Sequence, residues 1–505
     1  MLRQLHKTQL VSATGIPSLK KGLIYLGATR ISSQKFSTTH PSRRESEGEW
    51  LHKLDYGQEI FNYGHRRGTR NNTPVYTLHS RKPLLHDDIQ KAVEHVVKRA
   101  SIFNIVIRER DGELWWNMQD KPKVDFKMYK QGKSLYDVQE DMWREGFDEV
   151  NGPLWRTCLM EADEEDKYVT PEIKKDYPHR YYLVSNPHHG LVDGQTSALF
   201  STPLITAINA VIEGDPLDKI IPFGEFVPNI EYIEADNLIK EKLLKDPVRL
   251  DAMKQAVIKS SKKPYLLDYY TPPKTDRAIS EHYFIEIDPN IVKRFSENCK
   301  QKGITYGTSL QTVTSTAYVE MLQEAGAADD AFDISVNMAI DSRRYLKKRA
   351  LPILGMHARQ MASVANIGKN PRDRFWENCH DLQKINKDLL KSGSAIEQEV
   401  IREHFLPKTP ASEYYKSAPP PTRDYGFNSV GNLDLAIKGE GKHVQISHIV
   451  SYQAVHDYVY PFYQQLFTYR GNDINMISYD SARVSEDTMN QIFDRIKSIF
   501  AQFAK

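Results

Sequence analysis

The chain has 505 residues, of which 40% are hydrophobic and 27% charged, a composition that fits a folded globular protein and excludes wholesale disorder. The 68 basic residues nearly balance the 66 acidic ones, so a protein that coats nucleic acid is not expected. The mean hydropathy is −0.57 and no run of about 18 apolar residues occurs, so we expect no membrane-spanning helix.

Residues 1–44 differ in charge from the rest of the chain. They contain eight Lys or Arg residues, no Asp or Glu, and many Ser and Thr residues. This composition is typical of a transit peptide, so we expect a mitochondrial location, with a disordered basic tail on a cytoplasmic protein as the alternative. The remaining residues include 60 basic and 66 acidic ones, a net charge of −6.

From residue 49 onward, strand-like and helix-like patterns alternate. In the first half, one apolar face predicts a helix over 85–97, and β-rich or helical periods predict further elements up to Gly214. These further elements are strands at 102–108, 113–118 and 180–185 and a helix at 195–212.

Residues 215–275 are interrupted by prolines and predict a crossover with its own solvent-facing helices, between halves at 49–214 and 276–505. The second half repeats the mixed pattern, which predicts strands at 281–287 and 332–340, helices at 290–302, 308–324 and 485–503, and a turn at 439–441 that joins two strands. Two similar mixed halves predict a pair of α/β sandwiches with the ligand site in the cleft between them.

The strongest chemical signal is the segment His188-His189-Gly190-Leu191-Val192-Asp193-Gly194, placed between a predicted strand and a predicted helix. A neutral histidine, with an ordinary pKa near ~6.5, suits a general base. The aspartate four residues later could hold the turn if a buried arginine takes up its charge. Gly194 would then allow close backbone approach where the helix begins.

This HHxxxDG pattern resembles the signature of the CoA-dependent acyltransferase superfamily, which includes chloramphenicol acetyltransferase, plant BAHD acyltransferases, alcohol acetyltransferases and peptide-synthetase condensation domains. Three other stretches are similar to segments of these proteins. They are the GPLWR segment at 152–156, the NMAIDSRRYL segment at 337–346, and the DYGFN segment at 424–428 with the following Ser429-Val430-Gly431.

The resemblance covers about residues 49–505 and implies a fold of two chloramphenicol-acetyltransferase-like halves with the active site between them. It implies that His189 is the general base, with His188 behind it, and that Asp193 pairs with Arg343, or with Arg344 as the fallback. Ser429 and Asn428 are candidate donors to the oxyanion.

The implied activity is transfer of an acyl group from acyl-CoA to an alcohol or amine, with an ester product favoured over an amide. Acyl-CoA would be a co-substrate, without a tightly bound cofactor, and we expect a monomer that binds small molecules and no nucleic acid. The residues that bind CoA and the identity of the acceptor do not follow from the sequence.

Several other interpretations stay open. A His-His-x3-Asp cluster could bind a metal ion, but no third ligand is identifiable; the two histidines could also be merely structural. The basic run at 343–349 could bind RNA or CoA phosphates, although such runs usually form solvated faces. The aromatic tract at 452–469 is more often core than a ligand pocket. Three distant cysteines, Cys158, Cys299 and Cys379, predict neither a zinc site nor disulfides.

Two alternative functions belong to the same fold. The chain could be a catalytically silent binding or scaffold protein, although the intact His189 and Asp193 argue against this. It could also be a stand-alone condensation-type domain that uses a carrier-bound donor. No G-x-D-S carrier motif appears in the sequence, and the histidine motif lies mid-chain rather than near the carboxyl end, unlike in dihydrolipoyl acyltransferases.

Overall fold

A computed structural model describes most of the chain after the basic segment. It covers residues 48–129, 132–163, 167, 169–217, 222–228, 230–275, 277–416 and 419–505. All of these belong to one compact unit, Ser46–Lys505. The predicted transit peptide at 1–44 lies outside the described residues and stays a prediction.

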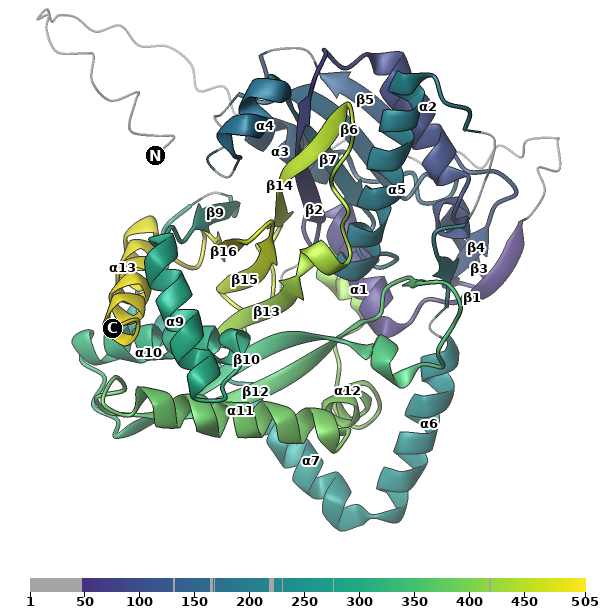
Figure 1. The fold of residues 1–505 in the computed structure, drawn as a ribbon. Helices are drawn as coiled ribbons and strands as arrows, with labels where there is room; N and C mark the ends of the chain where they lie inside the picture. The colour runs from purple at the N-terminus through teal and green to yellow at the C-terminus, as the bar shows by residue number, and fades with distance from the viewer. Residues whose placement is uncertain are drawn as a thin grey trace, which may run out of the picture. The chain divides into compact units, whose positions relative to one another are not determined.

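The first sheet has five strands in the order β14-β2-β7-β6-β5 (Figure 1). Its strands are β2 (Asn72–Ser80), β5 (Phe126–Tyr129), β6 (Trp155–Glu161), β7 (His179–Pro187) and β14 (Val444–Gln453). Strand β14 comes from the predicted second half and pairs antiparallel along the whole of β2, from Val444 opposite Ser80 to Gln453 opposite Asn72. The predicted second half therefore contributes one strand to the sheet of the first half.

Helices cover both faces of this sheet. Helices α2 (His86–Val97) and α5 (Gly194–Glu213) pack on one face, where Tyr76 and Leu183 join a large apolar cluster. Helix α3 (Leu135–Glu145) packs on the other face, where the neighbouring strand residues Val75 and Val184 contact Val138 and Met142 in a second cluster. The alternation of side chains along a strand places successive residues in opposite layers.

The second sheet has six strands in the order β12-β10-β13-β15-β16-β9. Its strands are β9 (Ser280–Phe284), β10 (Ala331–Asp341), β12 (Ala358–Gly368), β13 (Tyr425–Asn432), β15 (Phe462–Tyr469) and β16 (Asn472–Asp480). An apolar cluster joins this sheet to helices α9 (Pro289–Gln301), α10 (Tyr306–Glu324), α11 (Phe375–Lys391) and α13 (Glu486–Phe503).

Smaller elements surround the two sheets. Strands β1 (Glu49–Lys53), β4 (Glu113–Met118) and β3 (Ile105–Arg110) form a third sheet, and β8 (Glu225–Phe226) pairs with β11 (Ile353–Leu354). The remaining helices are α1 (Tyr56–Arg66), α4 (Pro171–Asp176), α6 (Ile230–Lys245), α7 (Pro247–Ser260), α8 (Leu266–Tyr269) and α12 (Ser394–His404). Short 3-10 turns occupy 101–104, 342–345, 411–415 and 433–435.

The predicted fold class, a mixed α/β pair of lobes, is confirmed by this architecture of two helix-covered sheets. Helices and strands with a clear apolar period, such as α2, β4, α10 and α13, lie within a few residues of their predicted bounds. The strand predicted at 102–108 begins later, because 101–104 form a 3-10 turn. Residues 439–441, predicted as a turn between two strands, form part of an irregular connection at 433–443, and the strands that it joins, β13 and β14, belong to different sheets.

No helix in the described part of the chain combines the length and apolar character that crossing a bilayer requires.

Candidate active site

The motif predicted to carry the chemistry forms the turn between β7 and α5. The backbone N–H of His188 donates to the Leu154 carbonyl on the neighbouring strand segment, at 2.8 Å, and so anchors the start of the turn. The N–H groups of Leu191 and Val192 then donate back to the His188 carbonyl, at 2.9 and 3.1 Å. These bonds curl residues 188–192 tightly and hold the two histidines at the edge of the first sheet.

His189 is held in one tautomer. Its Nδ1 lies 2.9 Å from the Val192 carbonyl, which can only accept, so Nδ1 carries the proton and the lone pair remains on Nε2. The residue is 9% exposed. Burial lowers the pKa of His189 below its ordinary value of 6.5, outweighing the Val192 carbonyl and Asp193, which raise it. The imidazole is therefore neutral at pH 7 and has a basic nitrogen available.

His188 is fully buried behind His189 and points toward helix α1. Its Nε2 lies 3.1 Å from Oδ1 of the Asn62 side chain, and its Nδ1 accepts the backbone N–H of Gly190 at 3.2 Å. Burial, with the neighbouring His189, lowers the pKa of His188 to about 3. With both ring nitrogens engaged, this side chain supports the turn.

A third histidine, His65 of α1, completes the support. Its Nε2 accepts the backbone N–H of His189 at 2.8 Å, and its ring stacks on His188 with 4.3 Å between centroids. Burial holds the pKa of His65 well below its usual value. Phe61, one turn earlier, meets the His189 ring edge-to-face at 4.7 Å. Helix α1 thus fixes both the backbone and the ring of the candidate base.

Asp193 makes the ion pair predicted for it with Arg343. The guanidinium contacts the carboxylate twice, Nη1 to Oδ2 at 2.7 Å and Nη2 to Oδ1 at 3.0 Å, and both side chains are buried. Burial by itself would raise the pKa of Asp193, but the Arg343 guanidinium and the Thr196 N–H more than offset it, so the pKa is lowered. The carboxylate also caps α5 by accepting that N–H at 2.8 Å.

The same ion pair ties the motif to the second sheet. The backbone N–H of His357, at the start of β12, donates to Asp193 at 2.9 Å, and Arg343 follows β10. Arg343 also donates to the carbonyls of Ile353 and Gly355, at 2.9 and 3.1 Å. Asp193 therefore orients the turn and joins the two sheets, and its carboxylate is committed to these partners.

The glycines of the motif have different surroundings. A Cβ built on Gly190 would lie 3.0 Å from the His188 ring and 3.3 Å from Phe61, so a larger residue would press on the histidine. A Cβ on Gly194 would meet nothing within 4 Å among the described residues. The packing of the described residues therefore does not require the close backbone approach predicted at Gly194.

The predicted oxyanion donors lie on β13 in the second sheet. Asn428 hydrogen bonds Tyr463, and Ser429 lies beside Gly307, the second residue of α10. The guanidinium of Arg70, whose charge acts on His189, lies 4.5 Å from the centre of the Tyr458 ring. Tyr458 stacks on Tyr460, and Tyr460 stacks on Tyr463. These rings connect the surroundings of His189 to Asn428. The role of Asn428 and Ser429 stays a prediction.

The basic run at 343–349 divides into internal and exposed residues. Arg343 serves Asp193, and Arg349 pairs with Glu225 at 3.0 Å and with Glu231. Arg344, the fallback partner for Asp193, is exposed and donates instead to the Asp341 carbonyl. Lys347 and Lys348 are exposed. Two of these five cations thus form ion pairs with carboxylates, and Arg344 binds a backbone carbonyl.

Within the described residues, no cluster of three or more His, Cys, Asp or Glu side chains is arranged to hold a metal ion. Cys158, Cys299 and Cys379 are buried, free thiols.

Helix α1, which supplies Asn62 and His65, is the main feature that the sequence interpretation missed. Its buried residues Gln58, Asn62 and His65 recur with helical spacing, but all are polar, so a search for apolar periodicity does not find them. The signal that was available is the capping box formed by Asp55 and Gln58. His357 also contacts the site, through its backbone N–H.

Comparison with solved structures identifies the same fold in proteins of distant sequence. TRI3 trichothecene 15-O-acetyltransferase from Fusarium sporotrichioides matches with a TM-score of 0.64 and 13% identity, over 92% of this chain and all of that one. The condensation domain of the monacolin K polyketide synthase MokA matches with a TM-score of 0.62 and 13% identity, over 90% of this chain and 98% of that one.

A mutant starter condensation domain of rhizomide synthetase RzmA, solved in complex with C8-CoA and Leu-SNAC, matches with a TM-score of 0.58 and 12% identity, over 90% of this chain and 94% of that one. No protein-family model and no curated protein sequence matches the chain.

Proposed function

We propose that this chain, which has the fold of condensation domains and of an O-acetyltransferase, transfers an acyl group from a CoA thioester to an alcohol, with His189 as the general base. The observation that carries the proposal is the state of His189. Its Nδ1 proton is committed to the Val192 carbonyl and burial keeps the ring neutral, so Nε2 can accept a proton.

In the proposed reaction, Nε2 of His189 takes the proton of the acceptor hydroxyl as its oxygen attacks the thioester carbonyl. A C–O bond forms, and the carbonyl oxygen becomes an oxyanion that Ser429 or Asn428 would stabilise by donating a hydrogen bond. Collapse of the intermediate breaks the C–S bond, and the proton on Nε2 passes to the CoA thiolate. The base is then neutral again for the next turnover.

Asp193 is a positioning residue in this scheme. Its two carboxylate oxygens are occupied by Arg343, Thr196 and His357, and it caps the helix that follows the base. It keeps the turn in place while the Val192 carbonyl fixes the tautomer of His189.

An ester product is favoured over an amide by the likeness to an enzyme described as a 15-O-acetyltransferase, and a CoA donor is supported by a neighbour solved with C8-CoA. The exposed Lys347 and Lys348 lie four and five residues after Arg343 and are candidates to bind the CoA phosphates. A donor bound to a carrier protein is the second candidate, because several of the structural neighbours are condensation domains of a polyketide synthase or of a synthetase.

The direct test is a matrix of acyl-CoA donors against mixed alcohols and amines, with release of free thiol and mass spectrometry of the products. We expect acceptor-dependent thiol release and new esters. The same acyl groups as pantetheine thioesters test the second candidate. Turnover with pantetheine donors alone would favour the carrier-bound donor, and no acceptor-dependent product with either donor would favour a binding or scaffold protein.

A further inference from the structure

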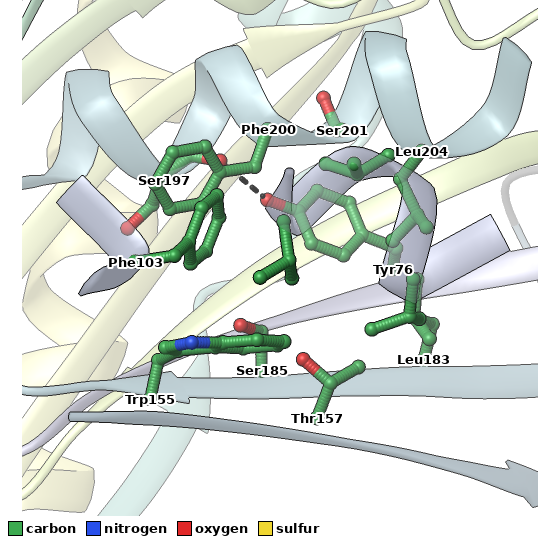
Figure 2. A pocket seen from close by; sticks show the side chains of 13 residues that line it. Tyr76, Phe103, Trp155, Thr157, Leu183, Ser185, Ser197, Phe200, Ser201 and Leu204 are labelled. Atoms are coloured by element: carbon green, nitrogen blue, oxygen red, sulfur yellow. Dashed lines mark hydrogen bonds between the residues drawn. The ribbon is translucent and has the colours of Figure 1, made fainter. Parts of the chain in front are cut away.

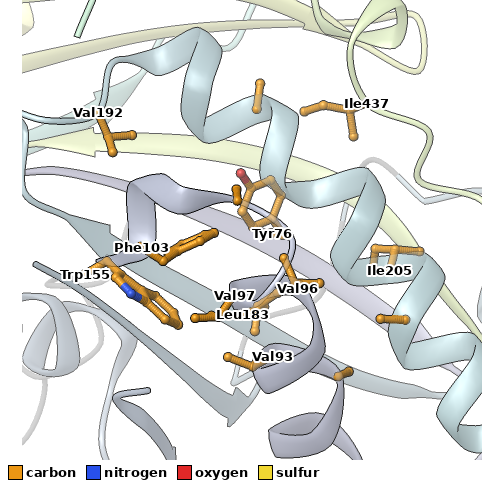
Figure 3. Close-up of a cluster of buried hydrophobic side chains, with 14 of the residues drawn as sticks. Tyr76, Val93, Val96, Val97, Phe103, Trp155, Leu183, Val192, Ile205 and Ile437 are labelled. Carbon is orange, nitrogen blue, oxygen red and sulfur yellow. The ribbon is translucent and has the colours of Figure 1, made fainter. Parts of the chain in front are cut away.

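The interior of the first lobe is too tightly packed to hold a substrate. An apolar cluster that includes Tyr76, Val96 and Leu183 fills the space between the five-stranded sheet and helices α2 and α5 (Figure 3). The cavity that remains lies between β2, β6 and β7 on one side and α2, α5 and the turn at 101–104 on the other (Figure 2). Its volume is about 40 Å³, which holds about three water molecules. A substrate of His189 would therefore bind outside this core, beside the histidine turn itself.

Arg70 reaches the surroundings of the histidine turn from the segment just before β2. Its φ is +59°, in the left-handed region that is unfavourable for a residue with a long side chain. Its side chain passes α1 at Gly64, where a Cβ would lie 2.5 Å from Cδ and 2.8 Å from Cγ of Arg70. Gly64 lies in the chain between Phe61 and His65, two residues of α1 that contact His189. The strained backbone and the glycine in the helix together place this arginine near the candidate base.

The guanidinium of Arg70 has only neutral partners among the described residues. Its Nη2 donates to the Asp457 carbonyl at 3.3 Å, and the group lies 4.5 Å from the centre of the Tyr458 ring. The Asp457 carboxylate forms an ion pair with Arg67 instead, at 2.6 Å. Arg70 is 9% exposed, so its charge has lost most of its hydration. A buried cation without a counter-ion is unfavourable, and an anionic ligand would relieve the cost.

The other buried arginines differ from Arg70 in this respect. In the described part of the chain three arginines are at most 9% exposed: Arg70, Arg156 and Arg423. Arg156 contacts the Glu145 carboxylate at 3.1 Å, and Arg423 directly precedes the buried Asp424, whose charge acts on it. Arg70 is the one of the three that has no carboxylate of its own. It therefore has the capacity to bind an anion from outside the protein.

The position of Arg70 beside His189 indicates which anion this is. Burial, and to a smaller extent the charge of Arg70, lower the pKa of His189, so the two side chains are close enough to interact. The phosphates of CoA lie at the far end of the pantetheine arm from the thioester, whereas Arg70 lies beside the base. A guanidinium has five N–H donors in a planar fork that matches a carboxylate. A ligand with a hydroxyl group at Nε2 of His189 and a carboxylate at Arg70 would satisfy both groups.

We propose that Arg70 binds a carboxylate of the acceptor, and that the acceptors of this protein are hydroxy acids. The hydroxyl group lies at Nε2 of His189, and the carboxylate lies at the guanidinium of Arg70. The donor is held by its CoA moiety, whereas a small acceptor needs a second point of attachment to keep its hydroxyl group in the reacting position. This inference rests on the proposed function, since it takes His189 to be the base that receives the acceptor.

The first test compares each acid with its own methyl ester, which keeps the hydroxyl group and removes the charge. The acceptors are 3-hydroxybutanoate, 6-hydroxyhexanoate and 4-hydroxybenzoate, which differ in the spacing between hydroxyl and carboxylate, with acetyl-CoA as donor. We expect kcat/KM for at least one acid to exceed that of its ester by at least about tenfold, the usual contribution of hydrogen bonds to a charged group.

The second test measures binding without turnover, so that it can fail independently of the proposed reaction. The same acids and esters are titrated into the full chain by calorimetry without any donor. The preferred acid should bind at least about ten times more tightly than its ester. Acid-selective binding that is lost in Arg70→Met, without turnover of any acceptor, would support the carboxylate site and count against the proposed reaction alone.

Arg70→Met removes the charge and keeps the length of the side chain, so the preference for acid over ester should disappear in both tests. Arg70→Lys should keep part of it, because an ammonium retains the charge without the planar fork. Arg81→Met is the matched control. Arg81 follows β2 at its other end, lies 4.4 Å from the centre of the Tyr177 ring and donates to the Lys442 carbonyl at 2.6 Å. The control should keep the full preference.

The pH dependence gives a readout that a merely structural role of Arg70 would not move. Without the positive charge, the pKa of His189 should rise, because the protonated ring no longer faces a like charge. In Arg70→Met the rise of the rate with pH on an ester acceptor should therefore move to higher pH. Arg81→Met should leave it in place.

Three results would overturn the proposal. The first is equal affinity and equal kcat/KM for every acid and its ester in the wild-type protein, a result that stands even where Arg70→Met does not fold. The second is a preference for the acid that survives in folded Arg70→Met. The third comes from succinyl-CoA and acetyl-CoA compared with butanol as the acceptor: a preference for succinyl-CoA that Arg70→Met abolishes would place the carboxylate on the donor instead of the acceptor.

Discussion

Two buried aspartates, one beside each sheet, have pKa values that are shifted in opposite directions. Asp193 faces a guanidinium in a two-point contact and receives two backbone N–H groups, and its pKa is lowered. Asp424, just before β13, receives the N–H groups of Ser335 and Tyr265 at 2.7 and 3.0 Å, but its cation, Lys262, lies 3.5 Å away. Burial dominates there and raises its pKa.

The backbone donors are similar at the two sites, so the difference comes from the cation. A bidentate guanidinium matches the geometry of a carboxylate, whereas an ammonium on a flexible stem does not. The histidine turn is therefore held by a fully charged pair, and the start of β13 by a carboxyl group on which burial weighs more heavily. Removing the cation should therefore lower the free energy of unfolding more at the histidine turn than at the start of β13.

The largest expected effect is that of Arg343→Ala. It leaves Asp193 buried without its cation, which typically costs about 3–5 kcal/mol, and it also leaves the carbonyls of Ile353 and Gly355 without their donor. Urea unfolding of the variant measures the loss. Affinity for CoA should change less than stability, because Arg343 is committed to Asp193.

Lys262→Ala is the matched substitution at the other aspartate and should cost less than Arg343→Ala, since Lys262 Nζ makes one 3.5 Å contact and Asp424 keeps the N–H groups of Ser335 and Tyr265. Equal losses of unfolding free energy in the two variants would contradict the comparison. A stable Arg343→Ala protein with normal turnover and weakened CoA binding would show that Arg343 belongs to the CoA site instead.

A second pair of substitutions compares glycines of the two motifs. In Gly426→Ala the new Cβ would lie 2.5 Å from the Tyr463 ring and 2.8 Å from Tyr460, and such overpacking usually costs about 1–3 kcal/mol. Gly194→Ala meets only open space, so the melting temperature should stay near that of the wild type. A lower affinity of Gly194→Ala for acyl-CoA would indicate that substrate approaches the backbone there.

As the pH falls from 7, His188 should lower the free energy of unfolding before Asp193 is protonated. An unfolded histidine binds a proton near pH 6.5, whereas His188 in the fold does so only near 3, so the unfolded state takes up more protons as the pH falls. Because of His188, the free energy of unfolding should drop by up to about 1.4 kcal/mol per pH unit below pH 6.5.

His282 and His357, with pKa values lowered to about 3 and about 4 by burial, should add to this slope. Asp193 contributes only near and below its ordinary pKa of 3.8, whereas Glu403, whose pKa burial raises to about 7, acts in the opposite direction between pH 7 and 5. The contribution of His188 is therefore measured as the difference between wild type and variant. A His188→Gln protein should show a shallower pH dependence than the wild type over this range. An unchanged slope would mean that the pKa of His188 is the same in the folded and unfolded states.

The sequence predicted the features that depend on a local residue pattern. Apolar periodicity located α2, α10 and α13, and the spacing of the motif, with the family resemblance, led to the pairing of Asp193 with Arg343. It was less informative where contacts depend on the fold. Helix α1 has a polar buried face, and β14 joins the first sheet although it follows β13 in the chain. The cavity beneath α5 is made by six elements and has no local signature.

The most direct test of the general-base assignment is His189→Ala, with thiol release measured on the best donor and acceptor found. We expect the fold and acyl-CoA affinity to persist while turnover falls by about 10²–10⁴-fold, the usual contribution of a positioned base. His188→Ala should lose less turnover and more stability, and His86→Ala, at an exposed position, should change neither. The wild-type rate should rise with pH only below 6.5 and then level off, because the pKa of His189 is lowered. Near-normal thiol release by folded His189→Ala would contradict general-base catalysis.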